Sequence, residues 1–132
     1  MDLSTLLAFL VIVTTVVGWL IVHIFDKHRD NLNKKKEIRI NFLINAWRLL
    51  ESASNQENNA LVHNTEIAIA DIQLFGSKRQ IELAQKIAID MATSKQADTL
   101  DLLKNLRADL RKELKLEVVP DNFKFLRIKK NS

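Results

Sequence analysis

Histidines and carboxylates are the residues with which this chain of 132 residues could perform acid–base or metal chemistry. The three histidines do not cluster: His23 and His28 stand five residues apart, not at the four-residue spacing of a helical metal pair, and His63 stands alone. The carboxylates are spread singly, and the Glu-x-x-His motif of di-iron helical proteins is absent. We therefore predict no metal, no cofactor and no acid–base pair.

The sequence also lacks the residues and motifs that are typical of nucleophilic catalysis. The chain has no cysteine, so it has neither a thiolate nucleophile nor a disulfide framework. Neither a Gly-x-Ser-x-Gly motif nor a Ser-x-x-Lys motif in a catalytic setting occurs. These absences predict no catalytic residue, and we expect a protein that is not an enzyme.

The longest apolar segment covers residues 3–25, which contain no Asp, Glu, Lys or Arg. As a helix it would be about 34 Å long, and the apolar core of a bilayer is about 30 Å thick. A cleaved signal peptide is disfavoured, because the chain starts with Met-Asp, the apolar run is too long and no Ala-x-Ala site follows. Residues 1–25 are therefore predicted to form a transmembrane anchor.

Basic residues predict the orientation of this anchor. Only Asp2 precedes the span, whereas Lys27, Arg29 and the Lys34–Lys35–Lys36 run follow it. Because basic residues stay on the cytoplasmic side, the N-terminus is expected outside and residues 26–132 inside. This arrangement predicts a single-pass membrane protein whose C-terminal domain is cytoplasmic. Its expected membrane-interface residues in and after the span are Trp19, Lys34, Lys35 and Lys36.

Two further segments are basic. Residues 26–37 lack Gly and Pro, so they either continue the membrane helix or form a flexible linker. The tail, residues 118–132, mixes aromatic and basic side chains as interfacial segments do, although its phenylalanines could instead pack on the helical domain. The membrane-interface residues predicted in the tail are Phe123, Phe125, Lys129 and Lys130.

The net charge of +4 lies mostly beside the span and in the tail. An anionic lipid surface accounts for this excess. Nucleic acid is disfavoured as a partner, because Asp109, Glu113 and Glu117 dilute the basic residues of the last predicted helix.

Between these basic segments, residues 38–117 repeat apolar side chains at spacings of three and four, which predicts helices. We expect an all-α protein in which one N-terminal transmembrane helix precedes a small cytoplasmic helical bundle. The expected cytoplasmic helices cover residues 38–53, 60–75, 78–91 and 99–116.

One of the two glycines of the chain, Gly76, interrupts this helical pattern. It stands where a helix would end, and glycine adopts the left-handed conformation there without penalty. Ser77 follows and can cap a new helix, with Gln80 completing the Ser-x-x-Gln capping box. We therefore predict a helix–helix corner at Gly76 and Ser77.

The segments IADIQLFGSKRQIELA and LRADLRKELKLE resemble parts of uncharacterised bacterial membrane proteins over about residues 66–117. Those proteins have one N-terminal span followed by a small cytoplasmic helical domain with a Leu-Phe-Gly corner. The resemblance therefore implies the same architecture in a bacterial inner (plasma) membrane, and it implies no activity, ligand or catalytic residue.

The sequence combines a membrane anchor with apolar helical faces, and it contains no set of residues typical of a catalytic site. This combination indicates a membrane-tethered interaction or scaffold module. Its partners are expected to be the lipid bilayer and either another protein or further copies of this chain. The alternative is a small membrane-acting effector or toxin component that oligomerises through its span, in which Thr14, Gly18 and His23 would matter. The partner-binding residues predicted for the scaffold module, if exposed, are Trp47, Phe75, Leu103, Leu106 and Leu110.

Overall fold

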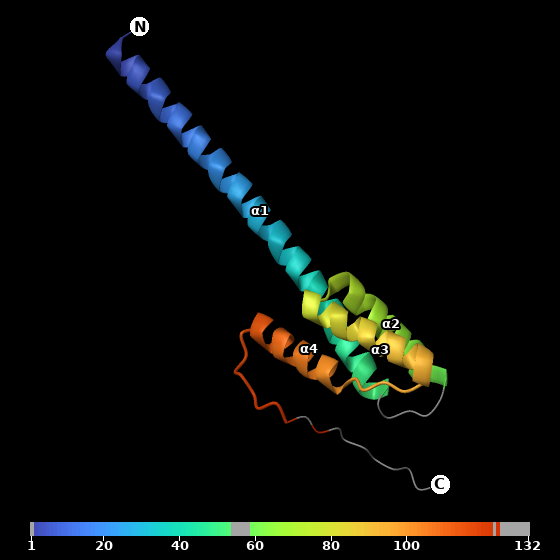
Figure 1. Cartoon of the computed structure of the whole chain (residues 1–132). Helices are drawn as coiled ribbons and strands as arrows, with labels where there is room; N and C mark the ends of the chain where they lie inside the picture. Colours follow the sequence, from blue (N-terminus) through green and yellow to red (C-terminus); the bar gives the residue numbers. More distant parts are fainter. Residues whose placement is uncertain (1, 54–58, 123, 125–132) are drawn as a thin grey trace. The chain divides into compact units, whose positions relative to one another are not determined.

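A computed structural model describes residues 2–53, 59–122 and 124 of the chain. These residues form four α-helices and no strand, which confirms the all-helical prediction for this part of the chain (Figure 1). The chain divides into two units, Met1–Glu37 and Ile38–Ser132. The helices are α1 (Leu3–Ala53), α2 (Asn59–Phe75), α3 (Lys78–Ser94) and α4 (Leu100–Glu113).

The first unit consists of the N-terminal part of α1. Within the described part of the chain, α1 is the one helix long and apolar enough to cross a membrane, judged by length and composition. The Thr14 hydroxyl donates hydrogen bonds to the carbonyl oxygens of Leu10 and Val11 at 3.0 and 2.9 Å, and the Thr15 hydroxyl donates to Val11 at 2.7 Å. These threonines thus satisfy their hydroxyl groups inside their own helix, as an apolar environment would require.

Residues 26–37 are helical and belong to α1, so the first of the two alternatives for this segment holds. Their composition explains this, because neither Gly nor Pro interrupts the backbone hydrogen bonds. One exposed ion pair, between Arg29 and Asp26 at 3.4 Å, lies along this stretch. Such exposed pairs contribute little to stability, so local helix propensity is the main support here.

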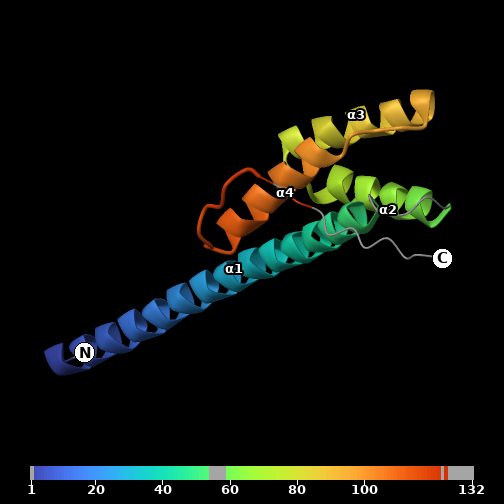
Figure 2. The ribbon, with the colours of Figure 1, turned by 90° about the horizontal axis from the view of Figure 1, so that it is seen from below.

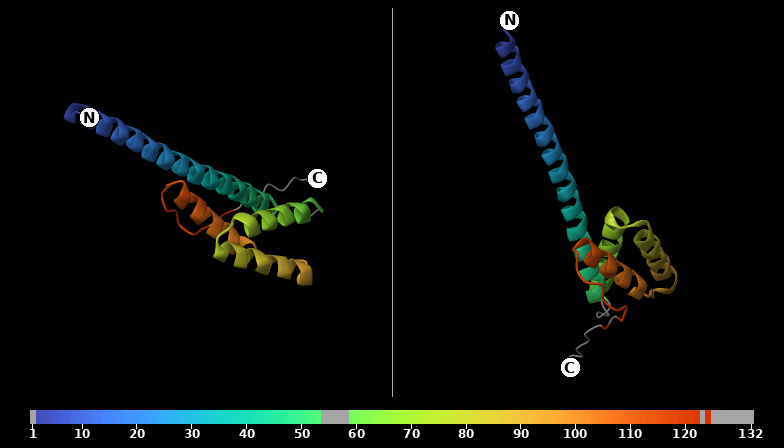
Figure 3. Two further views of the ribbon diagram at one scale, coloured as in Figure 1. Left: turned by 90° about the horizontal axis from the view of Figure 1, so that it is seen from above. Right: turned by 90° about the vertical axis from the view of Figure 1, so that its left-hand side faces the viewer.

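The second unit is built around one hydrophobic core to which all four helices contribute. Helix α2 lies beside α3, and α4 lies beside α3 (Figures 1, 2 and 3). The apolar spacing seen in the sequence places the buried side chains on one face of each helix. The buried core residues are Leu43, Ala46 and Leu50 of α1, Ala68, Ile69 and Ile72 of α2, Ala84 and Ile87 of α3, and Leu102, Leu103, Leu106 and Leu110 of α4.

The corner between α2 and α3 contains both hydrogen bonds of the predicted capping box. The Ser77 backbone N–H donates to Gln80 Oε1 at 2.8 Å, and the Gln80 backbone N–H donates to Ser77 Oγ at 3.4 Å. Together these bonds satisfy two backbone donors that the first turn of α3 would otherwise leave without partners. The capping chemistry therefore fixes where α3 begins.

The left-handed conformation predicted for Gly76 is wrong, because its φ angle is not positive. Glycine is required at this corner for space instead. The Gly76 N–H donates to the Ile72 carbonyl oxygen at 2.7 Å, and a Cβ atom on Gly76 would lie 2.5 Å from that same oxygen. Glycine is needed at position 76 because the Ile72 carbonyl oxygen lies too close for a Cβ atom, and not because the backbone there is left-handed.

Two lysines with positive φ mark the ends of the last two helices. Lys95, at φ 56°, caps α3, and its N–H donates to the Met91 carbonyl oxygen at 3.1 Å. Lys115, at φ 55°, follows α4, which ends at Glu113, earlier than the predicted residue 116. A residue in the left-handed region cannot continue a right-handed helix, so α4 ends before Lys115.

The segment after α4 is held against α4 by two arginines. The Arg107 guanidinium donates to the Pro120 carbonyl oxygen at 2.7 Å, and Arg111 Nε donates to the Glu117 carbonyl oxygen at 2.9 Å. Between these two bonds, the Val118 side chain is 99% exposed. Backbone carbonyls, and not apolar contacts of Val118, therefore attach this segment to the domain.

Candidate functional site

The leucine edge of the last helix, predicted to bind a partner if it is exposed, is buried. Leu103 and Leu106 are 0% exposed and Leu110 is 8% exposed, and all three belong to the hydrophobic core. The apolar face of α4 is covered by the other helices of the second unit, because that face supplies four of the core leucines. These leucines cannot present a surface to another molecule while the domain is folded.

Trp47 and Phe75, the other two predicted partner-binding residues, are half-buried. Both pack against the hydrophobic core. The Phe75 ring also stacks on the ring of Phe42, with centroids 4.4 Å apart and planes 16° apart. A stacked aromatic pair of this kind links α1 to the end of α2, so Phe75 has a structural role.

The predicted membrane-interface residues in α1 are exposed along the helix. The Trp19 ring stacks on the His23 ring, one turn further on, with centroids 5.5 Å apart and planes 8° apart. Lys34, Lys35 and Lys36 follow on the same helix. The interface residues predicted in the tail, Phe123, Phe125, Lys129 and Lys130, lie outside the described residues.

A polar cluster lies in the second unit and connects three helices. Asp109 Oδ2 of α4 accepts hydrogen bonds from Arg39 of α1 at 3.1 Å and from Gln80 Nε2 of α3 at 2.9 Å. Arg39 Nε also donates to the Phe75 carbonyl oxygen at 3.0 Å, and Arg39 lies 3.8 Å from Glu113. Gln80 is 0% exposed, and its amide is satisfied by Asp109 and by the capping box.

The geometry of this polar cluster suits structure better than catalysis. The Asp109 carboxylate accepts hydrogen bonds from side chains of α1 and α3, and the positive charge of the Arg39 guanidinium group balances its negative charge. The Asp109 carboxylate thereby joins α4 to α1 and to α3. This cluster could not be predicted from the sequence, because its members stand up to 70 residues apart and no local pattern connects them.

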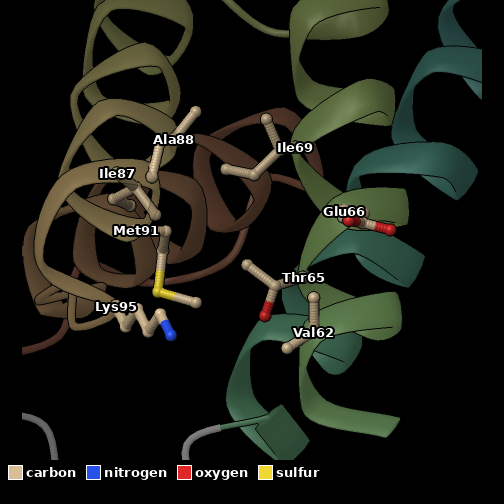
Figure 4. A pocket seen from close by; sticks show the side chains of 9 residues that line it. Val62, Thr65, Glu66, Ile69, Ile87, Ala88, Met91 and Lys95 are labelled. Carbon is tan, nitrogen blue, oxygen red and sulfur yellow. The ribbon is translucent and has the colours of Figure 1, made fainter. Parts of the chain in front are cut away.

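An apolar groove is the candidate binding surface of the second unit. It has a volume of about 520 Å³ and lies between the N-terminal half of α2 and the C-terminal half of α3 (Figure 4). Thr65 and Ile69 form part of its α2 wall, and Ile87 and Met91 form part of its α3 wall. The remaining lining residues are Val62 and Glu66 of α2, Ala88 and Ala92 of α3, and Lys95, which caps α3.

The groove combines an apolar interior with one charge of each sign. Its volume falls within the range of pockets that bind small molecules or side chains of a partner. Val62 is 45% exposed at the mouth, and Met91 supplies an adaptable side chain. None of the sequence-predicted site residues lines this groove. No local sequence pattern indicates this groove, since a groove forms where two helices diverge.

In the described part of the chain, no group of three or more His, Cys, Asp or Glu side chains is placed to hold a metal ion. The residues that the structure describes thus define an all-helical class of protein with one apolar helix long enough to span a membrane. Comparison with known protein families, curated proteins and solved structures gave no match to this chain.

Proposed function

We propose that this chain is a non-catalytic interaction module, held at a bacterial inner membrane by one transmembrane helix. Its cytoplasmic helical bundle binds an apolar helix of a protein in the α2–α3 groove. The observation that carries this proposal is the groove itself, an open apolar surface between two helices of the second unit. Grooves of this kind recognise the apolar face of an amphipathic helix.

The anchor supports the membrane part of the proposal. Residues 3–25 are apolar and exposed along their whole length, and the basic residues Lys27, Arg29 and Lys34–Lys36 follow them. Trp19 and His23 offer a stacked, amphipathic pair near the inner end of this span, where such rings are favoured. The basic residues then lie where anionic lipid headgroups attract them.

Single introduced cysteines test this orientation, because the chain has no cysteine of its own. We expect a membrane-impermeant maleimide to label Asp2→Cys in intact spheroplasts, and to label Asp121→Cys only after the membrane is permeabilised. Both positions are exposed, so burial in the protein does not protect either one. The opposite labelling pattern, or recovery of the chain in the soluble fraction, would contradict the proposed topology.

A photo-crosslinking amino acid placed at Ala92 tests the groove in cells. We expect an adduct whose mapped peptide is an apolar helical segment of one protein, and we expect Val62→Arg to reduce its yield at least about tenfold by placing a charge at the mouth. Asp101 is exposed on α4 and serves as the control position, where this adduct should be absent. Equal adducts from both positions, or an adduct insensitive to Val62→Arg, would show that the groove is not the binding surface.

A further inference from the structure

We propose that one end of the second unit, here called the basal surface, docks on the anionic surface of the bilayer in which the chain is anchored. The basal surface lies where the chain enters the unit, at Ile38. This inference concerns a surface other than the groove, and it rests on the membrane anchor of the proposed function. The exposed side chains of the basal surface that meet the lipid headgroups are Leu74, Lys78, Lys112, Leu114, Lys115 and Leu116.

Arg39 brings the ends of the other three helices to this entry point. Its Nε donates to the carbonyl oxygen of Phe75, the last residue of α2, at 3.0 Å. Its guanidinium group lies 3.1 Å from Asp109 and 3.8 Å from Glu113, both near the end of α4. Asp109 also accepts a hydrogen bond from Gln80, in the first turn of α3, at 2.9 Å. The α2–α3 corner and the end of α4 therefore lie at the end of the unit where α1 enters it (Figure 1).

Large apolar side chains are exposed at this end. Leu74, the penultimate residue of α2, is 74% exposed. Leu114 caps the end of α4 and is 48% exposed, and Leu116, whose N–H donates to the Arg111 carbonyl oxygen at 2.8 Å, is 49% exposed. Contact with the headgroup layer removes part of this apolar area from water, which favours docking.

Basic side chains accompany these leucines. Lys78 begins α3, Lys112 lies in the last turn of α4 and Lys115 follows α4, and all three are exposed. Arg79 is also exposed, but it lies 3.6 Å from Glu82, so this pair adds no net charge. Exposed apolar side chains beside basic ones are the composition with which proteins bind the surface of an anionic membrane.

The opposite end of the unit carries the opposite charge. Where α3 ends and α4 begins, Asp90, Asp98 and Asp101 stand against Lys95. At the basal surface the exposed Glu117 reduces the basic excess without reversing it. An anionic lipid surface therefore attracts the basal surface and repels the opposite end. This difference in charge selects lipid headgroups as the occupant and determines which end of the unit faces them.

The chain keeps the basal surface within reach of the bilayer. Residues 26–37 are helical and extend about 18 Å between the predicted span and the second unit. The headgroup layer occupies about 6 Å of this distance, and attraction between charges acts over about 8 Å at physiological salt. Membrane helices tilt by up to about 40°, which shortens 18 Å to about 14 Å. Because the anchor makes docking intramolecular, a weak contact is sufficient.

Quenching of a fluorescent label by lipids tests this docking in the full chain. The label is placed at Val118→Cys, beside the basal surface, or at Gln96→Cys, near the opposite end. Both side chains are exposed, and the chain has no cysteine of its own. The chain is reconstituted in vesicles of phosphatidylcholine, with or without phosphatidylglycerol, that contain lipids with spin-labelled headgroups. We expect quenching at position 118 but not at position 96, only when phosphatidylglycerol is present, and weaker at high salt.

Charge reversal shows whether the basal lysines cause the docking. We expect Lys78→Glu/Lys112→Glu to reduce the ratio of docked to undocked units at least about tenfold, because each basic residue near an anionic surface contributes about a fivefold preference. The matched control is Arg48→Glu/Lys86→Glu, which reverses two exposed charges about 12 Å or more further along their helices. It should change the ratio less than about threefold. An unchanged urea midpoint for each double variant shows that the unit remains folded.

Three outcomes overturn the docking: equal quenching at the two label positions, quenching that does not depend on phosphatidylglycerol, or an equal loss of quenching in the two double variants. If the chain floats with the vesicles while the label at position 118 is not quenched, this inference alone fails and the anchor stands. If the chain does not float with the vesicles, the membrane part of the proposed function fails together with it.

Discussion

Replacing Gly76 with alanine is expected to lower the free energy of unfolding of the cytoplasmic domain by about 3 kcal/mol, at the upper end of the cost of overpacking. The added Cβ would lie 2.5 Å from the Ile72 carbonyl oxygen, 3.0 Å from Ile72 Cγ2 and 3.2 Å from Gln80 Cβ. A backbone oxygen cannot rotate away as a flexible side chain would. The corner must therefore open, and this movement disturbs the capping box of Ser77 and Gln80.

Urea unfolding of the full chain in detergent micelles measures this effect. The chain has two tryptophans, so a Trp19→Phe background leaves Trp47, which packs against the core, as the fluorescent reporter. The second glycine supplies a matched control, because a Cβ on Gly18 would meet nothing within 4 Å. Gly18→Ala should leave the midpoint unchanged. Equal midpoints for Gly76→Ala and the native chain would show that the corner relaxes freely.

Replacing Asp109 with leucine is expected to cost about 2 kcal/mol, measured by the same unfolding experiment. The carboxylate accepts hydrogen bonds from Arg39 and Gln80, and Gln80 is 0% exposed. Removing the Asp109 carboxylate leaves the buried Gln80 amide N–H without this hydrogen-bond acceptor. It also removes one of the two carboxylates that balance the charge of Arg39. The desolvation of that amide is the larger part of the cost, since Asp109 and Arg39 are themselves partly exposed.

A double-mutant cycle separates these two contributions. Asp109→Leu/Gln80→Leu removes the buried donor together with its acceptor, so its cost should be smaller than the sum of the two single costs. The exposed pair of Arg79 and Glu82, 3.6 Å apart, provides the control, and Glu82→Leu should change the stability by less than about 0.5 kcal/mol. Strict additivity in the Asp109 and Gln80 cycle would mean that their hydrogen bond contributes nothing.

Local signals in the sequence predicted local structure well. The Ser-x-x-Gln motif identified the start of α3 because the two residues of a capping box bond to each other's backbone, which requires no distant part of the chain. The helical periodicity likewise identified the four helical segments of the second unit. The role of Gly76 was predicted for the wrong reason, because a glycine needed for space and one needed for a left-handed turn look alike in a sequence.

The candidate surface could not be predicted because it depends on how the helices pack. The leucine edge of α4 was assigned to a partner, but periodicity reveals only that a face is apolar and not what covers it. The polar cluster joins Arg39 to Asp109 across 70 residues, and the groove exists only where α2 and α3 diverge. Both features are set by tertiary contacts that leave no short-range pattern.

The segment that follows α4 has a consequence for how freely this sequence can vary. Arg107 and Arg111 hold it through the carbonyl oxygens of Pro120 and Glu117, and every amino acid offers such an oxygen. The two arginines of α4 thus determine the path of the segment that follows α4. The side chains along this segment, such as the fully exposed Val118, are not constrained by these bonds. Related sequences could therefore diverge here in identity while keeping both arginines and the direction in which the chain leaves the domain.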